Sequence, residues 1–438
     1  MKKDKENNKA YAPVVAVICA LTLFVSVCSA FLVASSIKPD FRDTVKENVN
    51  NFLYQEKTDD TTEPVQNPSA RLMCAGNNMI YRSIYSFAAS LGSQSGKDYD
   101  FAPIYEKVKS IVSQADVAMI NQSAVLSDNI AVSSYPSFCS PTAVGDAIYD
   151  LGFNVINHAN KNVFDKDVQG ATDTLDYWAT KSGAIVTGLY RNETDKNTVK
   201  IKEVNGIKIA FLGFTDTVQS SLSSESEINV INLGDRDRTQ AEVYNIMKDM
   251  IQTAEDQADA VVVSMYFGNV SGEVTQSQKQ TVDYLVSFGA DLIIGCGVSN
   301  IQPVERITRD DGTSAVVYYS LGNFVSAEEK KENMLGGIAD VVFEKNGETG
   351  ETIVKSAKAI PIVTYYESGF TNFSVLPAEN LTDEDVASHS LNSYYGGFNV
   401  TYANETFAEN FKTVANASFT PATEPSSEES GSDTSVSD

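Results

Sequence analysis

Histidine is almost absent from this 438-residue sequence, which contains only His158 and His389. Two imidazoles cannot form a cluster of histidine ligands, so mechanisms that depend on such a cluster are excluded by count. A lone histidine at the end of a strand is also expected to be a hydrogen-bonded structural residue, which makes His158 a weak candidate for acid–base catalysis.

Cysteine is scarce as well, with five residues in the chain. Cys19 and Cys28 lie in an apolar run, and Cys74, Cys139 and Cys296 cannot all pair with one another. No disulfide framework is therefore expected. Buried free thiols are the simpler expectation, and a bond or a soft-metal pair between Cys139 and Cys296 stays open as an alternative.

Positive charge is in short supply. The sequence has 33 Lys and Arg against 58 Asp and Glu, so its formal net charge is −25. A phosphate backbone would be repelled, and nucleic acid is excluded as a main partner. Walker-type phosphate loops, dinucleotide-binding glycine fingerprints and the G-x-S-x-G serine motif are also absent.

One uncharged apolar run lies near the N-terminus, from Val14 to Ile37. It is long enough to cross a bilayer, because about 20 apolar residues suffice for a membrane-spanning helix. Lysines precede it, so residues 1–13 are expected in the cytoplasm and the main domain outside, as in a single-pass protein of the cell membrane. A signal peptide cleaved near Ala30 is the alternative.

Polar segments flank the middle of the chain. Residues 38–69 are charged and contain proline, which is typical of an extended stalk. Residues 419–438 are acidic and of low complexity, which predicts a disordered tail. Residues 366–418 are aromatic and rich in asparagine, and we expect them to pack on the domain as an extension.

Strand-like and helix-like patterns alternate between residues 70 and 365. Continuous apolar runs such as DLIIGCG (291–297) indicate strands that are buried on both faces. The pair Asn205-Gly206 between two alternating segments predicts a type I′ hairpin. These patterns predict an α/β fold of two packed sheets with helices outside, a layered α/β/β/α sandwich.

Helical spacing is clearest in three segments. Residues 101–115 predict one helix that Pro103 can start. Residues 140–152 predict another, with Ser140 as its cap and Pro141 in its first turn. Residues 167–183 predict a third, in which Asp165 and Asp167 mark an acid-favouring N-terminus. A catalytic carboxylate pair is the alternative for these two aspartates.

Seven segments fall at the expected strand ends, where α/β proteins place their functional loops. They are AGNNMIY (75–81), INQSAVL (120–126), YPSFCSP (135–141), NHANKNVFDKD (157–167), SMYFG (264–268), GCGVSNIQP (295–303) and YSLGNFVS (319–326). In order and spacing they resemble the CapA family of bacterial capsule or poly-γ-glutamate synthesis proteins, from about residue 71 to 365. The resemblance implies a calcineurin-like fold, a sandwich of the metallo-dependent phosphatase type.

The departures from the family's pattern fall at the positions that the resemblance marks as metal ligands. Where the family has Gly-Asp after the first strand, this sequence has Gly76-Asn77. Where the family has a His-Pro-His loop, this sequence has Gly-Val-Ser at residues 297–299. Asp165 still matches. The degenerate positions are Asn77, Ser123, Cys139, Lys161, Asn162, Tyr266, Gly297 and Ser299.

These replacements cannot hold the pair of divalent cations that the resemblance implies. Such a pair needs bridging carboxylates and imidazoles. An amide at position 77 cannot bridge two cations well, the phenol of Tyr266 stays protonated near neutral pH, and Lys161 adds a positive charge. We therefore expect no metal and no cofactor.

Three side chains remain candidates for holding a ligand: Lys161, Asp165 and Asn323. Lys161 could replace the charge of a lost cation and hold an anionic group, or it could be a solvated loop lysine. Asn323 is equally well explained as a turn residue, and the aromatic pair Tyr266 and Phe267 as filling the space of lost imidazoles.

The sequence therefore favours a catalytically inactive, membrane-anchored CapA-like protein outside the cytoplasm. Its expected role is binding or assembly in capsule, poly-γ-glutamate or cell-envelope polymer biosynthesis, with capsule-assembly proteins or an anionic surface polymer as partners. The alternative is an active metal-dependent hydrolase or transferase that acts on phosphoester or γ-glutamyl bonds through an atypical site.

Overall fold

The computed structural model describes residues 67–411, apart from residues 221, 223–227, 229, 236, 269–271 and 395, together with the backbone of residues 415–418. The expected apolar anchor at Val14–Ile37, the stalk up to residue 66 and the acidic tail lie outside the described residues. No helix within the described part of the chain is long and apolar enough to cross a membrane.

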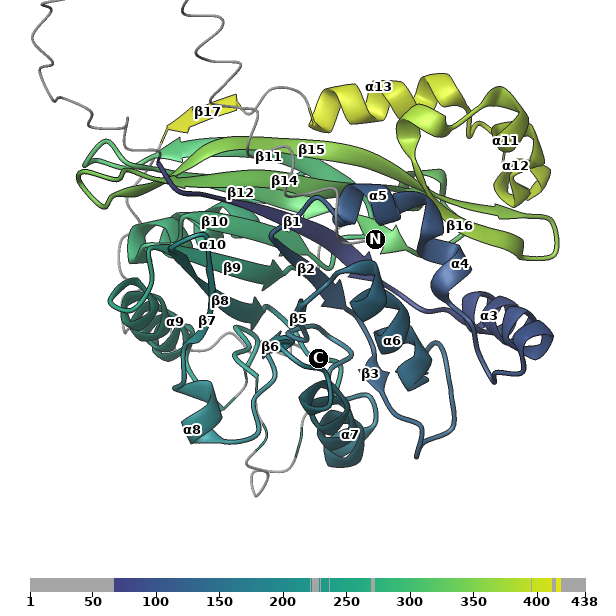
Figure 1. Cartoon of the computed structure of the whole chain (residues 1–438), viewed down its shortest axis with the longest axis horizontal. Coiled ribbons are helices and arrows are strands. Elements are labelled where there is room, and N and C mark those ends of the chain that lie inside the picture. Colours follow the sequence, from purple (N-terminus) through teal and green to yellow (C-terminus); the bar gives the residue numbers. More distant parts are fainter. Residues whose placement is uncertain are drawn as a thin grey trace, which may run out of the picture. The chain divides into compact units, whose positions relative to one another are not determined.

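The first sheet contains eight strands and is mixed (Figure 1). Its parallel centre, β1, β2, β5 and β6, is extended by an antiparallel meander of β14, β15 and β16, while β13 pairs with β1. The strand bounds are β1 Ser69–Asn78, β2 Val117–Gln122, β5 Val155–Asn157, β6 Ile185–Thr187, β13 Asn323–Val325, β14 Leu335–Lys345, β15 Thr352–Glu367 and β16 Thr371–Pro377.

The second sheet contains seven strands in the order β17-β11-β12-β10-β9-β8-β7. Strands β8, β9, β10 and β12 are parallel, β7 is antiparallel to β8, and β11 is antiparallel to β12 but parallel to β17. The bounds are β7 Lys200–Val204, β8 Ile207–Thr215, β9 Ala260–Tyr266, β10 Leu292–Cys296, β11 Ile301–Thr308, β12 Ser314–Leu321 and β17 Ala415–Ser418. A small separate ladder pairs β3 (Val125–Leu126) with β4 (Cys139–Ser140).

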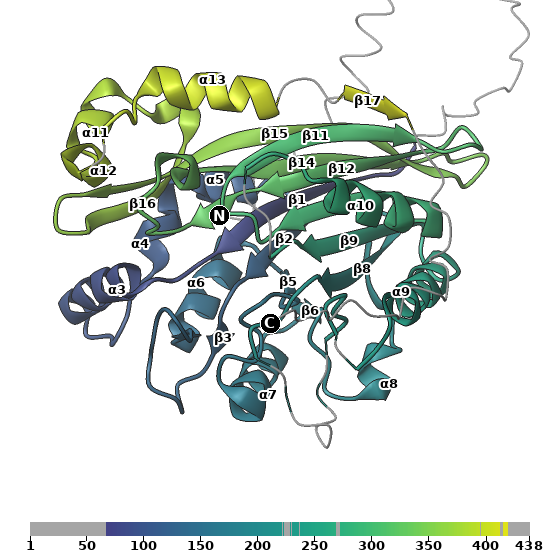
Figure 2. The ribbon, with the colours of Figure 1, turned by 180° about the vertical axis from the view of Figure 1, so that it is seen from behind.

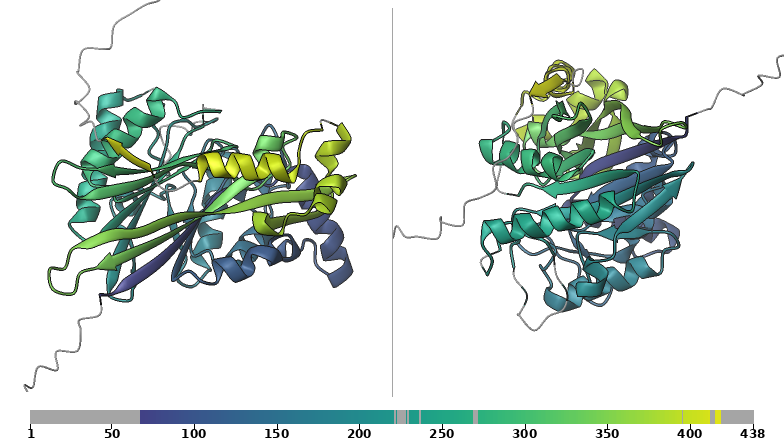
Figure 3. Two further views of the ribbon diagram at one scale, coloured as in Figure 1. Left: turned by 90° about the horizontal axis from the view of Figure 1, so that it is seen from above. Right: turned by 90° about the vertical axis from the view of Figure 1, so that its left-hand side faces the viewer.

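Three apolar clusters produce the layers (Figures 1 to 3). Residues such as Leu72 and Met119 from the first sheet meet Phe211 and Val262 from the second between the sheets. The outer face of the first sheet packs against α3, α4, α6 and the C-terminal helices, and that of the second packs against α9 and α10. The layered α/β/β/α arrangement predicted from the sequence is confirmed.

The helices have the following bounds: α3 Arg82–Ser95, α4 Ala102–Tyr105, α5 Lys109–Val112, α6 Thr142–Leu151, α7 Asp167–Ala179, α8 Glu193–Lys196, α9 Gln240–Glu255, α10 Gln276–Phe288, α11 Asp383–Ser388, α12 Ser390–Tyr394 and α13 Val400–Asn410. Short 3-10 turns lie at Glu106–Val108, Lys331–Met334 and Ala378–Asn380. Capping boxes at Thr239 and Thr275 fix the starts of α9 and α10, because each threonine accepts a bond from a free backbone amide.

Local predictions met mixed outcomes. Asn205 and Gly206 both have positive φ, as the predicted type I′ turn requires. The single helix expected over residues 101–115 is wrong, because a 3-10 turn divides it into α4 and α5. The cap assigned to Ser140 is also wrong: Ser140 lies in β4, and Pro141 stands at the N-cap without a side-chain bond.

The C-terminal segment joins the first layer. Strand β15 runs through residues 365 and 366, where the sequence suggested a boundary, and β16 continues the sheet beyond it. Leu391, Phe398 and Phe407 are buried in the same apolar cluster as Ile84 of α3. In Figure 1, α11 to α13 lie beside this end of the sheet.

Candidate functional site

The carboxyl ends of parallel strands from both sheets meet at one edge of the sandwich. Strands β1, β2 and β5 end there in Asn78, Gln122 and Asn157, and β9 and β10 of the second sheet end in Tyr266 and Cys296. The backbone amide of Gly297 donates to Oδ1 of Asn77 at 2.9 Å, which joins the two sheets directly. This edge is where an α/β fold offers a site.

Asn77 is the centre of this edge, and its amide group is fully engaged. Oδ1 accepts from Nδ2 of Asn121 at 2.8 Å and from the Gly297 amide. Nδ2 faces two oxygens at 3.3 Å, the carbonyl of Val298 and Oδ1 of Asn323. The side chain is 2% exposed, so these protein groups and not solvent satisfy it.

The amides continue on both sides of Asn77. Nδ2 of Asn157 donates to Oδ1 of Asn121 at 3.0 Å, and Asn121 also donates to Oγ of Ser123 at 3.2 Å. On the other side, Nδ2 of Asn323 donates to the carbonyl of Asn333 at 3.1 Å. We call Asn157, Asn121, Asn77 and Asn323 the asparagine chain; all four are buried.

Position 297 is closed to a larger side chain. Gly297 has φ of +94°, a conformation that side-chain-bearing residues rarely adopt. A Cβ there would lie 2.7 Å from the carbonyl oxygen of Phe267. A histidine at this position would therefore require the loop backbone to move.

Tyr266 and Cys296 face each other at the ends of β9 and β10 and are both buried. Burial raises the pKa of the Tyr266 phenol well above its ordinary value, and that of the Cys296 thiol to about 12. Both groups are thus neutral near pH 7. Cys74, Cys139 and Cys296 are free thiols, so the alternative of a Cys139–Cys296 bond is wrong.

Three candidate positions lie apart from the asparagine chain. Cys139 is in the β3–β4 ladder, where burial raises its pKa to about 11. Asn162 donates to Oδ2 of Asp165 at 2.9 Å, and the same oxygen accepts from the Phe138 amide at 2.7 Å. Asp165 therefore anchors a loop, although burial raises its pKa.

His158 is a structural residue, as expected for a lone histidine. Its Nε2 accepts a bond from Nε1 of Trp178 at 2.9 Å, so the ring is neutral at that nitrogen. Complete burial lowers its pKa to about 3. Such an imidazole cannot exchange protons with a substrate near neutral pH.

A cavity of about 710 Å³ opens beside this edge. Lys161, Gly297 and Ser299 line it, so the structure brings three of the degenerate positions to one opening. Glu328, Glu329 and Glu332 line it as well. We call this space the site cavity; it is polar, and its three carboxylates face the ammonium groups of Lys161 and Lys330.

The sequence matches the family described as "Bacterial capsule synthesis protein PGA_cap" over residues 71–328, which is more than half of the chain. The chain belongs to this family. The resemblance to CapA is thereby confirmed.

Two curated relatives carry the CapA name. The "PGA biosynthesis protein CapA" of Bacillus subtilis (strain 168) is 31% identical over 199 residues, 45% of this chain and 49% of that protein. The "Capsule biosynthesis protein CapA" of Bacillus anthracis is 26% identical over 185 residues, 41% of each chain. The chain thus matches about half the length of these PGA_cap relatives.

Solved structures overlap more loosely. A phosphatase from Mycoplasma pneumoniae has a TM-score of 0.39 at 13% identity, covering 67% of this chain and 94% of its own. The calcineurin-like phosphoesterase YfkN from Bacillus subtilis has a TM-score of 0.36 at 12% identity, covering 78% and 98%. Both overlaps are loose, and the layered fold of this PGA_cap chain follows from its own two sheets.

A divalent metal pair does not fit the donor set of this PGA_cap chain. The asparagine chain offers neutral amides whose hydrogens already point at protein oxygens, so a cation would meet Nδ2 groups as well as oxygens. Among the described residues, no group of three or more His, Cys, Asp or Glu could hold a metal ion. We therefore derive no step through a metal.

Sequence reasoning missed three residues that shape this PGA_cap site. Asn121 and Asn157 belong to the strand-end segments 120–126 and 157–167, but neither falls at a position where the sequence departs from the family's pattern. Their position at the carboxyl ends of two neighbouring parallel strands, where the two residues pair, was the available signal. Glu328 carried no such signal, because it follows an irregular segment after β13.

Proposed function

We propose that this protein is a membrane-anchored, extracytoplasmic PGA_cap protein that binds a polymer and does not cleave it. The polymer would be a capsule, poly-γ-glutamate or cell-envelope chain, and capsule-assembly proteins are the expected partners. Membership in the family supports the link to capsule polymers, and the names of the two Bacillus relatives point the same way. The anchor would be Val14–Ile37.

The asparagine chain is the observation that carries the non-catalytic part of this proposal. A hydrolytic centre of the calcineurin type needs charged ligands that can release and rebind water. Here the equivalent edge of the sheet is closed by amides that bond to one another and to Gly297 and Val298. Breaking these bonds to admit a substrate would leave buried polar groups unpaired.

Lys161 is the group that we propose for binding. It lines the site cavity and is only partly buried, and its ammonium makes no ion pair within the described residues. An ammonium group can attract the carboxylate of an anionic polymer while remaining hydrated. The three glutamates of the same cavity limit how many negative groups can enter, so one contact per polymer segment is expected.

The test uses the full-length chain and poly-γ-glutamate. We expect saturable binding, a loss of at least threefold in affinity for Lys161→Ala, and no change for Lys107→Ala, an exposed lysine on another surface. The same samples are assayed for release of glutamyl fragments and for phosphodiester hydrolysis with added Mn²⁺. Equal affinity in the Lys161→Ala variant would contradict the binding site, and turnover would favour the alternative of an active hydrolase or transferase.

Localisation has its own test. The full chain should sediment with the cell membrane, and protease added outside protoplasts should digest its main domain. Recovery of an intact chain from the soluble fraction of the cytoplasm would contradict the anchor.

A further inference from the structure

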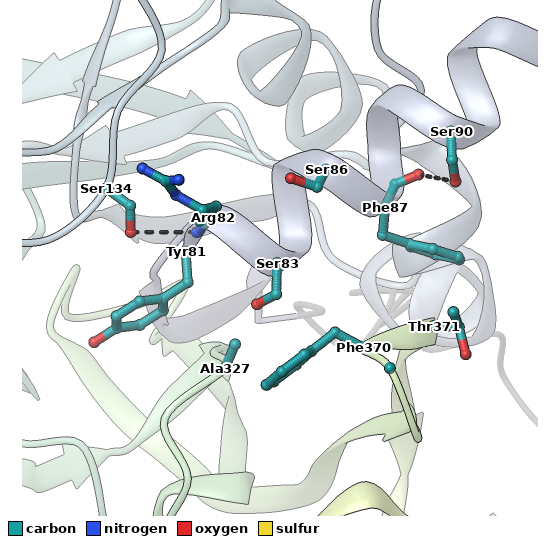
Figure 4. Close-up of a pocket in the computed structure, with 11 residues that line it drawn as sticks. Tyr81, Arg82, Ser83, Ser86, Phe87, Ser90, Ser134, Ala327, Phe370 and Thr371 are labelled. Atoms are coloured by element: carbon teal, nitrogen blue, oxygen red, sulfur yellow. Dashed lines mark hydrogen bonds between the residues drawn. The ribbon is translucent and has the colours of Figure 1, made fainter.

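A second cavity lies between helix α3 and the turn that joins β15 to β16 (Figure 4). Its volume is about 600 Å³, within the range of small-molecule sites. The first turns of α3 form one wall, and Phe370 reaches in from the opposite side toward Ala327. We call this space the α3 groove. It is separate from the asparagine chain and contains none of the site candidates.

Hydroxyl groups line the helical wall of the α3 groove. Ser83, Ser86 and Ser90 recur at intervals of three and four residues, which places them on one face of α3. The hydroxyl of Ser90 donates a hydrogen bond to the carbonyl oxygen of Phe87 at 2.7 Å. Ser83 and Ser86 make no side-chain hydrogen bond within the described part of the chain, so both can serve a ligand.

Aromatic rings form the remaining surfaces. Tyr81, Phe87 and Phe370 are each partly exposed and line the groove. Phe370 has φ of +57°, an uncommon conformation for a bulky residue. Its ring stacks on Tyr366, with centroids 5.4 Å apart and an interplanar angle of 17°. The strained turn and the stack together hold this ring in the groove, and such strain is often found at ligand sites.

Among the described residues that line the α3 groove, Arg82 is the charged one. Its side chain is exposed on the Ser134 side of the groove, and its backbone amide donates to Oγ of Ser134 at 3.2 Å. The guanidinium has no ion pair with any described residue. In a chain with a net charge of −25, an arginine left without a carboxylate partner can take one from a ligand.

We propose that the α3 groove binds an acidic oligosaccharide, a sugar chain that bears carboxylate groups. The C–H faces of a pyranose ring would pack on Phe370 and Phe87, because flat apolar rings suit such faces. The sugar hydroxyls would bond to Ser83 and Ser86, and a carboxylate would pair with Arg82 in a bidentate manner. This inference does not rest on the proposed function, because no residue of the groove enters that argument.

A hydrogen bond links one residue that lines the α3 groove to one that lines the site cavity. The hydroxyl of Tyr81, which lines the α3 groove, donates to Oε1 of Glu328 at 2.8 Å, and Glu328 lines the site cavity. The two cavities are thus neighbours with different linings. Arg82 lines only the α3 groove and Lys161 only the site cavity, so variants of these two residues probe the two cavities separately.

The test is isothermal titration calorimetry of the full chain with a defined oligogalacturonate, its carboxyl-reduced neutral counterpart and poly-γ-glutamate. We expect the acidic sugar to bind best. Arg82→Gln should weaken the acidic sugar about tenfold and leave the neutral one unchanged, while Phe370→Asn should weaken both, since asparagine tolerates the positive φ without supplying a ring. Arg191→Gln, at a partly exposed arginine paired with Asp176, should change neither.

Contrary results are equally defined. Absence of saturable sugar binding, or sugar binding that neither Arg82→Gln nor Phe370→Asn alters, would overturn the proposal. Tighter binding of poly-γ-glutamate than of the acidic sugar, with loss in Arg82→Gln, would replace the sugar by a peptide polyanion and also overturn it. Near-ultraviolet circular dichroism checks that the Phe370→Asn variant is folded. If it is not folded, the effect of Arg82→Gln on binding of the acidic sugar tests the proposal.

Discussion

The strand-end edge and the α3 groove differ in how their polar groups are used. At the edge, Asn77 accepts hydrogen bonds from Asn121 and from Gly297, and both asparagines are buried. In the groove, Arg82 and Ser86 are exposed and have no side-chain partner within the described residues. A polar group that is already satisfied contributes to stability, whereas one that is open to solvent is available for a ligand. The strand-end edge is thus the more structural of the two.

Asn77→Ala should produce the largest effect. The substitution removes the acceptor of the Gly297 amide and one of the two acceptors of the buried Asn121 side chain, and we expect a loss of about 3 kcal/mol in the free energy of unfolding. Urea denaturation measures it. Asn197→Ala, at an exposed asparagine, is the control and should change stability by less than about 0.5 kcal/mol. Equal losses of unfolding free energy for the two variants would show that the strand-end edge is no more structural than an ordinary surface.

The pH dependence of the buried His158 should give the next effect. Its folded pKa of about 3 lies below the ordinary value of 6.5, so the unfolded chain binds the proton more tightly. Stability from the neutral ring is complete above pH 6.5 and is lost as the pH falls toward 3. Between pH 7 and pH 5 this loss amounts to about 2 kcal/mol.

His158→Gln isolates this term, because glutamine can accept from Trp178 Nε1 without titrating. The difference in unfolding free energy between the wild type and this variant should shrink or reverse as the pH is lowered. A difference that is constant from pH 7 to pH 5 would show that the ring is accessible to protons.

Phe370→Asn should have a smaller effect on stability. Loss of the ring that stacks on Tyr366 is partly offset because asparagine accepts a positive φ, so we expect a change of about 1 kcal/mol. Thermal unfolding followed by circular dichroism gives the value. A loss as large as that of Asn77→Ala would place the α3 groove in the structural core and weaken its contrast with the edge.

Lys161→Ala should have the smallest effect, less than about 0.5 kcal/mol, because its partly exposed ammonium has no ion pair within the described residues. The same urea experiment measures it. A marked loss of stability would mean that Lys161 supports the fold, and it could then not be assigned to binding alone.

The sequence predicted the layered fold because continuous apolar runs and alternating helices leave few other arrangements. It could not predict that Asn77 bonds to Gly297, because 220 residues separate them and the bond depends on where a loop backbone turns. Helix α3 was not predicted from the sequence, and the α3 groove depends on this helix and on a distant hairpin turn. Local sequence patterns determine the helices and strands, whereas contacts between distant residues determine which side chains are bonded within the protein and which stay open to a ligand.

Metal content tests the central claim most directly. The full-length chain is incubated with Mn²⁺, Fe²⁺ or Zn²⁺, passed through a desalting column and analysed by mass spectrometry for metal per chain. A closed asparagine chain predicts less than one tenth of an equivalent at the strand-end edge, roughly the background of weak surface binding, and the same value for Asn77→Ala. Two equivalents of metal in the wild type that are lost in Asn77→Ala would contradict the account.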